Sequence, residues 1–216
     1  MQQVIIIHYN ITRSYQVFNR GKLAMDVKKY NGSDSVINEM IDDYNTRLQK
    51  LSQDPTISET DKYQYAHAKD GGNFACAYYK INNEAKMYIA HSGFNNENKF
   101  KYLEIFKDKY TLGYRPKLIG RTNTFRTITL NNICSEDSEK WDRWDDTESK
   151  ILEQIAFEVK EEFQHDIVLW TKRYPCPSCR CVIIEFEKKY KVNVTVYYKN
   201  RHENNPCDKG GGCNDN

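Results

Sequence analysis

The second half of the chain alternates between apolar residues at helical spacing and short, continuous apolar runs. Residues 151–163 repeat apolar side chains every three or four positions, which predicts an amphipathic helix. The acidic residues at 145–148 stand at its start, where the helix dipole stabilises negative charge. A buried strand over 166–171, a second helix over 179–190 and a strand over 192–198 follow. This alternation indicates an α/β fold.

An antiparallel hairpin is predicted ahead of these elements. Two short apolar runs, over 74–81 and 86–91, are separated by the polar residues 82–85, which are typical of a turn between paired strands. Together with the two later strands, the hairpin gives four core strands.

The N-terminal third is less regular. Apolar residues at helical spacing over 33–51 predict a helix with Ser33 or Asp34 as its cap. Residues 52–72 contain proline, serine, aspartate and paired glycines, so we interpret them as a loop carrying one helical turn. Residues 1–30 are consistent with one or two strands.

These elements predict one core domain with flanks. The length of 216 residues suits a single domain, which we assign to residues 74–199. Residues 1–73 form a partly helical flank that packs on this core or leads into it. Residues 200–216 are rich in Asn, Gly and Asp and predict a flexible tail that could supply a fifth strand.

Charge and hydropathy narrow the class of protein. Lys and Arg number 32 against 30 Asp and Glu, which excludes a polybasic, histone-like protein. The charge is segmented, because residues 95–130 carry eight cations against three anions and residues 135–164 carry eleven acids against four bases. No run approaches the roughly 18 apolar residues of a membrane span, and the apolar residues 4–7 are too few for a signal peptide. We therefore expect a soluble protein without a membrane partner.

The cysteines provide the first chemical feature. Seven is an odd number in a chain long enough to fold without disulfides, which disfavours a complete disulfide framework. Cys176 and Cys179 lie where a strand meets a helix, so the first helical turn brings both side chains to one face. Alone, such a pair fits a redox dithiol, half of a structural zinc knuckle or a catalytic zinc site. Cys207 and Cys213 could complete a site of four thiolates.

A catalytic zinc ion takes three protein ligands and one water, so a third ligand is needed. The tripeptide D-T-E over 146–148 opens the helix before the cysteine pair, and the starts of the two helices can converge at one edge of the sheet. Asp146 is therefore the candidate third ligand, and Glu148 faces the water on the metal. His91 is an alternative third ligand.

The motif D-T-E, followed by P-C-P-S-C and the helix C-V-I-I-E-F-E-K-K-Y, resembles the zinc-dependent cytidine deaminase-like superfamily, and within it the deaminase domains of bacterial polymorphic toxins. The segment Y-I-A-H-S-G over 88–93 is similar to one that precedes the first motif in such toxins. The resemblance covers residues 74–199. It implies a three-layer α/β/α sandwich with a mixed sheet of four to five strands. Asp146 departs from the pattern, since most of the superfamily has His or Cys there, but a carboxylate is also an acceptable zinc ligand.

The resemblance also implies an activity. We expect zinc-dependent hydrolytic deamination of cytosine to uracil in nucleic acid, with single-stranded DNA favoured. Zn²⁺ would be held by Asp146, Cys176 and Cys179, and Glu148 would carry the proton from the attacking water to the leaving ammonia. The resemblance further implies an effector that is secreted or delivered into the cytoplasm of a target cell, and an immunity protein that neutralises it.

Substrate binding is expected on aromatic and cationic side chains, through base stacking and phosphate contacts. The candidates are His91, Ser92, Lys117, Arg121, Arg126 and Trp144. Three other functions stay open. They are a deaminase of free nucleosides or nucleotides, a deaminase of RNA, and a zinc module that binds nucleic acid without catalysis.

Overall fold

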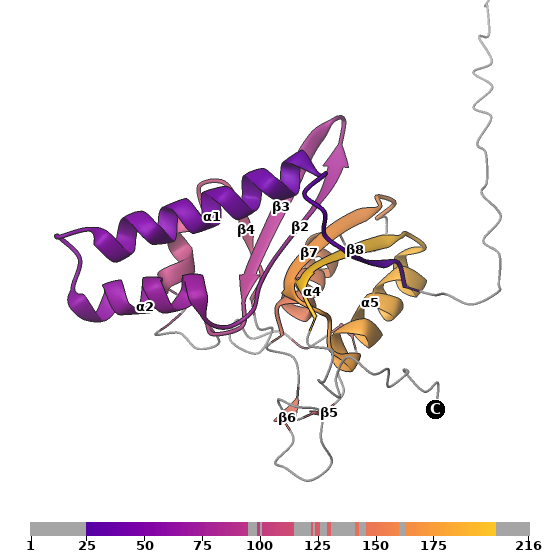
Figure 1. Cartoon of the computed structure of the whole chain (residues 1–216). Coiled ribbons are helices and arrows are strands. Elements are labelled where there is room, and N and C mark those ends of the chain that lie inside the picture. The colour runs from indigo at the N-terminus through magenta and orange to yellow at the C-terminus, as the bar shows by residue number, and fades with distance from the viewer. Residues whose placement is uncertain are drawn as a thin grey trace, which may run out of the picture.

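The computed structural model of the chain describes residues 25–94, 99, 101–114, 122, 124–125, 129–130, 141–142, 146–159 and 163–201. Within these residues a mixed sheet of six strands lies between two layers of helices (Figure 1). Its strand order is β1 (Val27–Lys29), β8 (Val194–Asn200), β7 (Ile167–Arg173), β2 (Phe74–Ile81), β3 (Glu84–His91) and β4 (Thr111–Leu112). A separate two-stranded sheet joins β5 (Thr129–Leu130) and β6 (Trp141–Asp142).

The predicted three-layer α/β/α sandwich is confirmed, but the number of strands differs. β2 pairs antiparallel with β3 and β7, whereas β8 pairs parallel with β7 and β1, and β4 pairs parallel with β3. The two strands beyond the predicted four are β1 and β4, at the two edges of the sheet. They are only three and two residues long, too short to show an alternating pattern. The tail that we expected to supply a fifth strand lies outside the described residues beyond Arg201.

The predicted hairpin is confirmed, with a tighter turn than the sequence indicated. Asn82 and Asn83 both have positive φ, 50° and 70°, which is the backbone of a two-residue type I′ turn. Asparagine tolerates this left-handed conformation better than most residues. The pairing of β2 with β3 therefore begins at Ile81 and Glu84, directly on either side of the turn.

The first helix, α1 (Ser35–Gln53), is also as predicted. The side chain of Asp34 caps it by accepting hydrogen bonds from the backbone N–H groups of Val36 and Ile37, each at 3.0 Å. Its buried residues recur every three or four positions and are Ile37, Met40, Tyr44 and Leu48.

The loop predicted for residues 52–72 is wrong over most of its length, because α2 (Glu59–Asp70) occupies it. Only Tyr65 and Ala68 of this helix are buried, so almost no apolar period marks it in the sequence. Ser58 caps the helix by accepting from the N–H of Asp61, and the Asp61 carboxylate accepts from Tyr102 and Lys101 of the next segment. This helix is stabilised by its cap and by polar tertiary contacts rather than by an apolar stripe.

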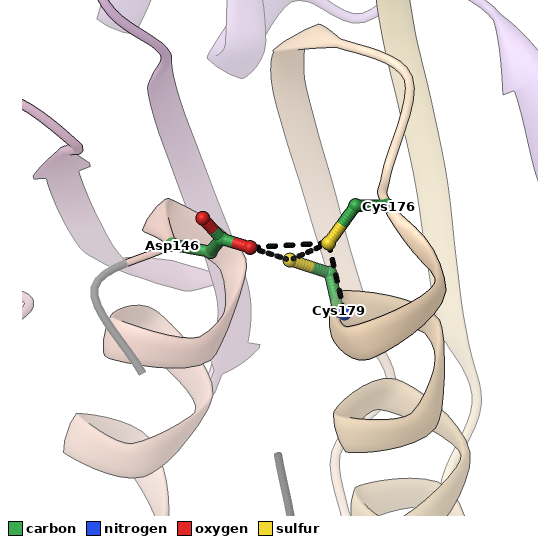
Figure 2. A group of neighbouring side chains, drawn as sticks. All are labelled: Asp146, Cys176 and Cys179. Atoms are coloured by element: carbon green, nitrogen blue, oxygen red, sulfur yellow. Dashed lines mark hydrogen bonds between the residues drawn. The ribbon is translucent and has the colours of Figure 1, made fainter. Parts of the chain in front are cut away.

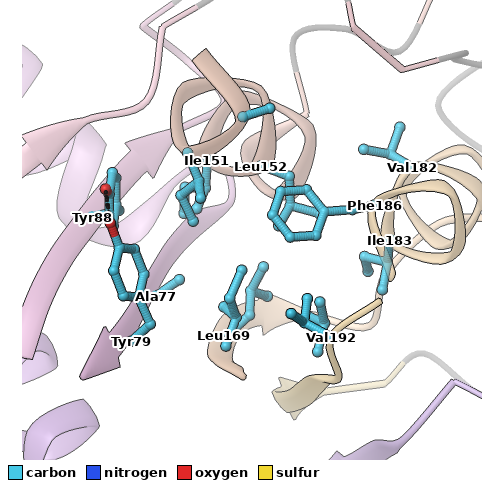
Figure 3. Close-up of a cluster of buried hydrophobic side chains, with 14 of the residues drawn as sticks. Ala77, Tyr79, Tyr88, Ile151, Leu152, Leu169, Val182, Ile183, Phe186 and Val192 are labelled. Atoms are coloured by element: carbon cyan, nitrogen blue, oxygen red, sulfur yellow. Dashed lines mark hydrogen bonds between the residues drawn. The ribbon is translucent and has the colours of Figure 1, made fainter. Parts of the chain in front are cut away.

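The two faces of the sheet carry separate hydrophobic cores. Alternate residues of β2 point to opposite faces, so Ala75, Ala77 and Tyr79 join one core while Phe74 and Cys76 join the other. The first core packs the sheet against α4 (Thr147–Val159) and α5 (Pro177–Tyr190), as Figure 3 shows. The second packs it against α1, α2 and the short 3-10 helix η1 (Lys101–Phe106). Both helices of the first core were predicted, although α5 starts two residues earlier than expected.

The N-terminal segment contributes to the same fold. β1 extends the sheet beside β8, and α1 and α2 cover its second face. The domain boundary at residue 73 stays a prediction, and the apolar residues 4–7 lie outside the described residues. Among the described helices, none combines the length and apolar character that crossing a membrane requires.

Candidate metal centre and catalytic carboxylate

The N-termini of α4 and α5 meet at one edge of the sheet. The backbone carbonyl of Asp146 accepts the N–H of Lys150 at 3.1 Å, and that of Cys176 accepts the N–H of Arg180 at 3.0 Å. Asp146 and Cys176 therefore occupy equivalent cap positions, one at the start of each helix. The positive ends of two helix dipoles point at their side chains and favour a carboxylate and thiolates there.

Three ligand atoms gather between these helix starts. Cys176 Sγ lies 3.1 Å from Asp146 Oδ2, Cys179 Sγ lies 3.3 Å from the same oxygen, and the two sulfurs are 3.5 Å apart (Figure 2). A tetrahedral zinc ion, with Zn–S of about 2.3 Å and Zn–O of about 2.1 Å, separates two sulfurs by about 3.8 Å and a sulfur from an oxygen by about 3.6 Å. The three donors thus fit one metal ion after shifts of about half an ångström or less. Three protein ligands are the number that catalytic zinc sites use.

The electrostatics of this group favour a cation. Burial raises the pKa of the Cys179 thiol well above its ordinary value, and the neighbouring Cys176, Asp146 and Glu148 raise it further. Crowding several acidic groups in a buried place makes their anionic forms costly together. A divalent ion between them removes that cost, because thiolates and carboxylates bind metal only in their deprotonated forms.

Glu148 lies beside the three ligands. Its side chain is only 2% exposed, and Oε2 is 3.4 Å from Cys179 Sγ. Burial is the largest cause that raises its pKa, and the carboxylate of Asp146 adds to it, whereas hydrogen bonds from Thr171 and Thr147 act in the opposite direction. The raised pKa means that this carboxylate binds a proton more readily than an ordinary glutamate does.

A hydrogen-bond network holds the Glu148 carboxylate in place. Thr171 Oγ1 donates to Oε1 at 2.7 Å, and Thr147 Oγ1 donates to Oε2 at 2.8 Å. The side-chain amide of Asn73 donates to both threonine oxygens, at 2.7 Å to Thr147 and 2.9 Å to Thr171. Both oxygens of Glu148 are therefore hydrogen-bonded, Oε1 by Thr171 of β7 and Oε2 by Thr147 of α4.

His91 lies outside the group of ligands. The N–H of Gly93 donates to Nδ1 at 3.0 Å, so Nε2 carries the proton and donates to the carbonyl of Gly71 at 3.2 Å. Burial lowers the pKa of His91 to about 3, so its ring is neutral. Gly72 has a positive φ of 64° and packs against this ring, where a Cβ would lie 2.6 Å from His91 Cε1. The structure therefore brings Asp146, and not His91, to the two cysteines.

A scan against family models matches residues 57–200 to Toxin-deaminase, described as the BURPS668_1122 family of deaminases. The match covers two thirds of the chain and includes the three ligand candidates and Glu148. The chain belongs to this toxin-deaminase family. Searches of curated proteins and of solved structures found no match. Family membership makes the protein a deaminase. The matched region begins at residue 57, just before α2, within the flank predicted for residues 1–73.

Several predicted site residues of this toxin-deaminase cannot be placed. Lys117, Arg121, Arg126 and Trp144 lie outside the described residues, as do Cys207 and Cys213 of the alternative site with four thiolates. Ser92 is described, and its Oγ accepts the N–H of Asn73 at 2.8 Å. Substrate contact by His91 and Ser92 stays a prediction. Cys181 is disulfide-bonded, so it supplies no further thiolate to the deaminase site.

Sequence reasoning missed three residues of the toxin-deaminase site. Thr147 stands inside the D-T-E motif, where its position at the helix start signalled a polar contact. Asn73 and Thr171 carry no such signal, because only the pairing of β2 with β7 brings them together and against α4.

Proposed function

We propose that this toxin-deaminase is a zinc-dependent hydrolase that converts cytosine to uracil in nucleic acid, with single-stranded DNA as its preferred substrate. The observation that carries the proposal is the position of Glu148, with Oε2 3.4 Å from Cys179 Sγ, beside three donors that fit one metal ion. Carboxylate, metal ligands and water then lie within reach of one another, which hydrolytic removal of an amine requires.

The zinc ion and the protein side chains would have separate roles in the reaction. Asp146, Cys176 and Cys179 would hold zinc, which supplies Lewis acidity that lowers the pKa of a water in its open position. Glu148 takes the proton of the attacking water at Oε2 and returns it to the substrate as the C4–N bond breaks. Water and cytosine thus give uracil and ammonia. The burial of Glu148 excludes bulk water that would compete for this proton.

A cluster of aromatic and cationic side chains next to the ligands supports a polymeric substrate. The guanidinium groups of Arg201 and Arg180 lie 4.8 and 5.9 Å from the ring centroid of Tyr174, and the ring of Tyr198 meets Tyr174 edge-on at 5.0 Å. Tyr174 stands two residues before Cys176. We call these four residues the Tyr174 cluster. Cations that contact phosphates and rings that stack on bases are what single-stranded nucleic acid binds.

The direct test compares substrates. Zinc-loaded protein is incubated with cytosine-containing single-stranded DNA, duplex DNA, RNA and free cytidine, beside Glu148→Gln, and uracil and ammonia are measured. We expect single-stranded DNA to be converted fastest, with activity that falls steeply as salt rises. Faster conversion of RNA or cytidine would move the proposal to those substrates. Strand binding by wild type and Glu148→Gln alike, without uracil from any substrate, would favour the non-catalytic zinc module.

The Tyr174 cluster has its own test. Tyr174→Leu should raise KM for single-stranded DNA about tenfold, because stacking contributes on the order of 1–3 kcal/mol per base, and should leave turnover of free cytidine unchanged. Tyr63→Leu is the matched control, since Tyr63 is an exposed tyrosine on α2. Equal effects of the two substitutions would remove the support that the cluster gives to a strand substrate.

The family's description as a toxin supports two further parts of the proposal. The protein would act after delivery into the cytoplasm of a target cell, and the cell that makes it would need an immunity protein. Expression in a bacterial cytoplasm should be toxic for wild type and harmless for Glu148→Gln, and a neighbouring gene that suppresses the toxicity would encode the partner.

A further inference from the structure

Asn73 lies outside both motifs of the site and yet contacts the catalytic carboxylate. It follows α2 and directly precedes β2, about 75 residues before Glu148. Its side-chain nitrogen Nδ2 is 2.7 Å from Thr147 Oγ1, 2.9 Å from Thr171 Oγ1 and 3.4 Å from Glu148 Oε1. One side chain thus joins the start of β2 to α4 and β7.

The orientation of this amide is fixed by its other contacts. The backbone N–H of Arg173 donates to Asn73 Oδ1 at 3.1 Å, so the oxygen must face β7 and the nitrogen must face the threonines. The backbone of Asn73 is held as well, because its N–H donates to Ser92 Oγ at 2.8 Å and its carbonyl accepts the N–H of Ser92 at 2.9 Å. Asn73 therefore has little freedom to turn.

The hydrogen bonds then run in one direction. An amide nitrogen has two hydrogens, and one points to each threonine oxygen. A hydroxyl has a single hydrogen, and an oxygen that accepts from Asn73 is free to direct that hydrogen onward to Glu148. The Thr147 hydroxyl does so to Oε2 at 2.8 Å. The Thr171 hydroxyl lies 2.7 Å from Glu148 Oε1 and 3.3 Å from Asn73 Oδ1, so its single hydrogen favours the shorter contact, to Glu148.

We propose that Asn73 is a positioning residue for the deamination reaction, which fixes both threonine hydroxyls as donors to Glu148 and so holds the carboxylate with Oε2 toward the metal ligands. The proposal rests on the proposed function, in which Glu148 moves the proton. Asn73 acts mainly through the threonines, because its own contact with Glu148 is the long one of 3.4 Å to Oε1, whereas Oε2 takes the proton. The competing explanation is that Asn73 only fills the space between β2, β7 and α4.

Two substitutions separate these explanations. Asn73→Asp keeps the size and shape of the side chain but replaces the amide donors with acceptors, so the threonine hydroxyls turn toward the new carboxylate and leave Glu148. Asn73→Ala removes the side chain but leaves the hydroxyls free to donate to Glu148. If Asn73 positions the threonine hydroxyls, Asn73→Asp should lower kcat more than Asn73→Ala. If Asn73 only fills space, Asn73→Ala should lower kcat more.

The kinetic result expected is a loss in kcat on the order of 10²-fold for Asn73→Asp and about tenfold for Asn73→Ala, since small displacements of a reacting group carry costs of this size. KM should change less than about twofold and zinc content should stay at one per chain. The matched control is Asn38→Asp on α1, whose amide also bridges two partners and which should leave kcat unchanged. A kcat for Asn73→Asp nearer to wild type than that of Asn73→Ala would overturn the proposal.

A double-mutant cycle tests whether Asn73 works through the hydroxyls. In the background Thr147→Val with Thr171→Val, Asn73→Ala should lower kcat by less than about twofold. An undiminished loss in that background would show that Asn73 acts by another route.

Crystal structures of wild type, Asn73→Asp and Asn73→Ala give a measurement independent of activity. We expect the Glu148 carboxylate to leave its place in Asn73→Asp and to keep it in Asn73→Ala. If wild type deaminates no substrate, the proposed function fails, while these structures still decide whether Asn73 orients Glu148. An unmoved Glu148 in Asn73→Asp would contradict the positioning role even in an active enzyme.

Discussion

The two faces of the sheet are packed with different side chains. We call the face under α4 and α5 the catalytic face and the face under α1, α2 and η1 the aromatic face. Fewer than a third of the core residues on the catalytic face are aromatic, whereas more than half of those on the aromatic face are. Tyr44 shows the aromatic packing best, because its ring stacks on Phe74 at 3.6 Å and on Phe106 at 5.2 Å between centroids.

The polar groups of the two faces are arranged differently as well. On the aromatic face, tyrosine hydroxyls donate to single carboxylates around the rim, as Tyr110 does to Asp43 and Tyr78 to Asp34. On the catalytic face, the carboxylates of Asp146 and Glu148 meet the thiols at one edge. Polar contacts on the aromatic face join neighbouring elements, while those between the starts of α4 and α5 on the catalytic face converge on one point.

The cysteines on the two faces also differ in their surroundings. Cys76 is fully buried on the aromatic face, and burial raises the pKa of its thiol far above the ordinary range. Cys176 and Cys179 lie at a helix N-terminus beside a carboxylate. Burial alone makes a cysteine inert, whereas a helix N-terminus favours the thiolate form that a metal ion binds. Substitutions should therefore separate into those that stop the chemistry and those that weaken the fold.

The largest effect is expected for Glu148→Gln on the catalytic face. Loss of the proton shuttle should lower kcat by about 10²- to 10⁴-fold, while the Tm stays equal or rises because a buried carboxylate is removed. Glu158→Gln is the matched control on the same helix, since Glu158 pairs with Lys86 and Tyr88 away from the ligands. Deamination rates and thermal unfolding measure both quantities, and comparable kcat losses in the two variants would refute the assignment of Glu148.

Phe106→Ala on the aromatic face should lower the stability of the fold and leave kcat unchanged, the opposite of what is expected for Glu148→Gln. Phe106 is fully buried, so its truncation should lower the free energy of unfolding by about 3–5 kcal/mol. Below the Tm, kcat of the folded fraction should match wild type. Denaturant unfolding with activity measured in parallel checks this, and a fall in kcat would mean that the aromatic face supports the site directly.

The folded protein should lose stability as the pH falls, because His91 is buried in its neutral form. Burial, with the charges of Lys150 and Lys172, lowers its pKa to about 3 in the folded chain, against an ordinary value of 6.5 when unfolded. Between these values only the unfolded chain binds the proton, so stability falls as the pH drops below about 6.5 and does not change from this cause above it. The contribution approaches about 1.4 kcal/mol per pH unit.

The variant His91→Asn tests this contribution, because its side chain can still accept the N–H of Gly93 but does not titrate. The free energy of unfolding of wild type should fall more steeply between pH 6 and pH 4 than that of the variant, by about 1.4 kcal/mol per unit. Parallel slopes for the two proteins would be incompatible with a buried neutral His91.

The smallest effect is expected at the start of α2. Ser58→Ala removes the side-chain acceptor for the N–H of Asp61 and should lower the free energy of unfolding by about 1 kcal/mol, with kcat unchanged. Chemical denaturation measures the loss, with Ser52→Ala near the end of α1 as the control. If Ser58→Ala had no larger effect than Ser52→Ala, tertiary contacts rather than the cap would hold α2.

Elements with long periodic patterns could be predicted from the sequence. α1 buries residues at every third or fourth position, and the apolar residues of α4 and α5 keep that spacing although α4 is buried on all sides over 147–156. The β2–β3 hairpin showed itself as two apolar runs on either side of a polar turn. α2 was missed because polar contacts and a cap hold it. β4 was missed, and β1 lies within residues 1–30, where one or two strands were expected without bounds. A strand of two or three residues takes its partner from the fold, not from its own pattern.

Those site residues that stand in short sequence motifs could be predicted. Asp146, Glu148, Cys176 and Cys179 stand at fixed spacings at two helix starts, and residue types at such spacings indicate a metal site. Asn73, directly before β2, and Thr171 of β7 reach Glu148 from distant parts of the sequence, so their contact depends on sheet register. A single sequence does not reveal such register-dependent contacts.

The most direct test of the metal centre is X-ray absorption at the zinc edge of the zinc-loaded full-length chain, with zinc content measured alongside. The arrangement of Asp146, Cys176 and Cys179 predicts one zinc per chain with two sulfur ligands at about 2.3 Å and the remaining ligands oxygen at about 2.0–2.2 Å. Cys176→Ser combined with Cys179→Ser should abolish this signal. Four sulfur ligands, or zinc binding that survives the double substitution, would contradict a catalytic zinc between the starts of α4 and α5.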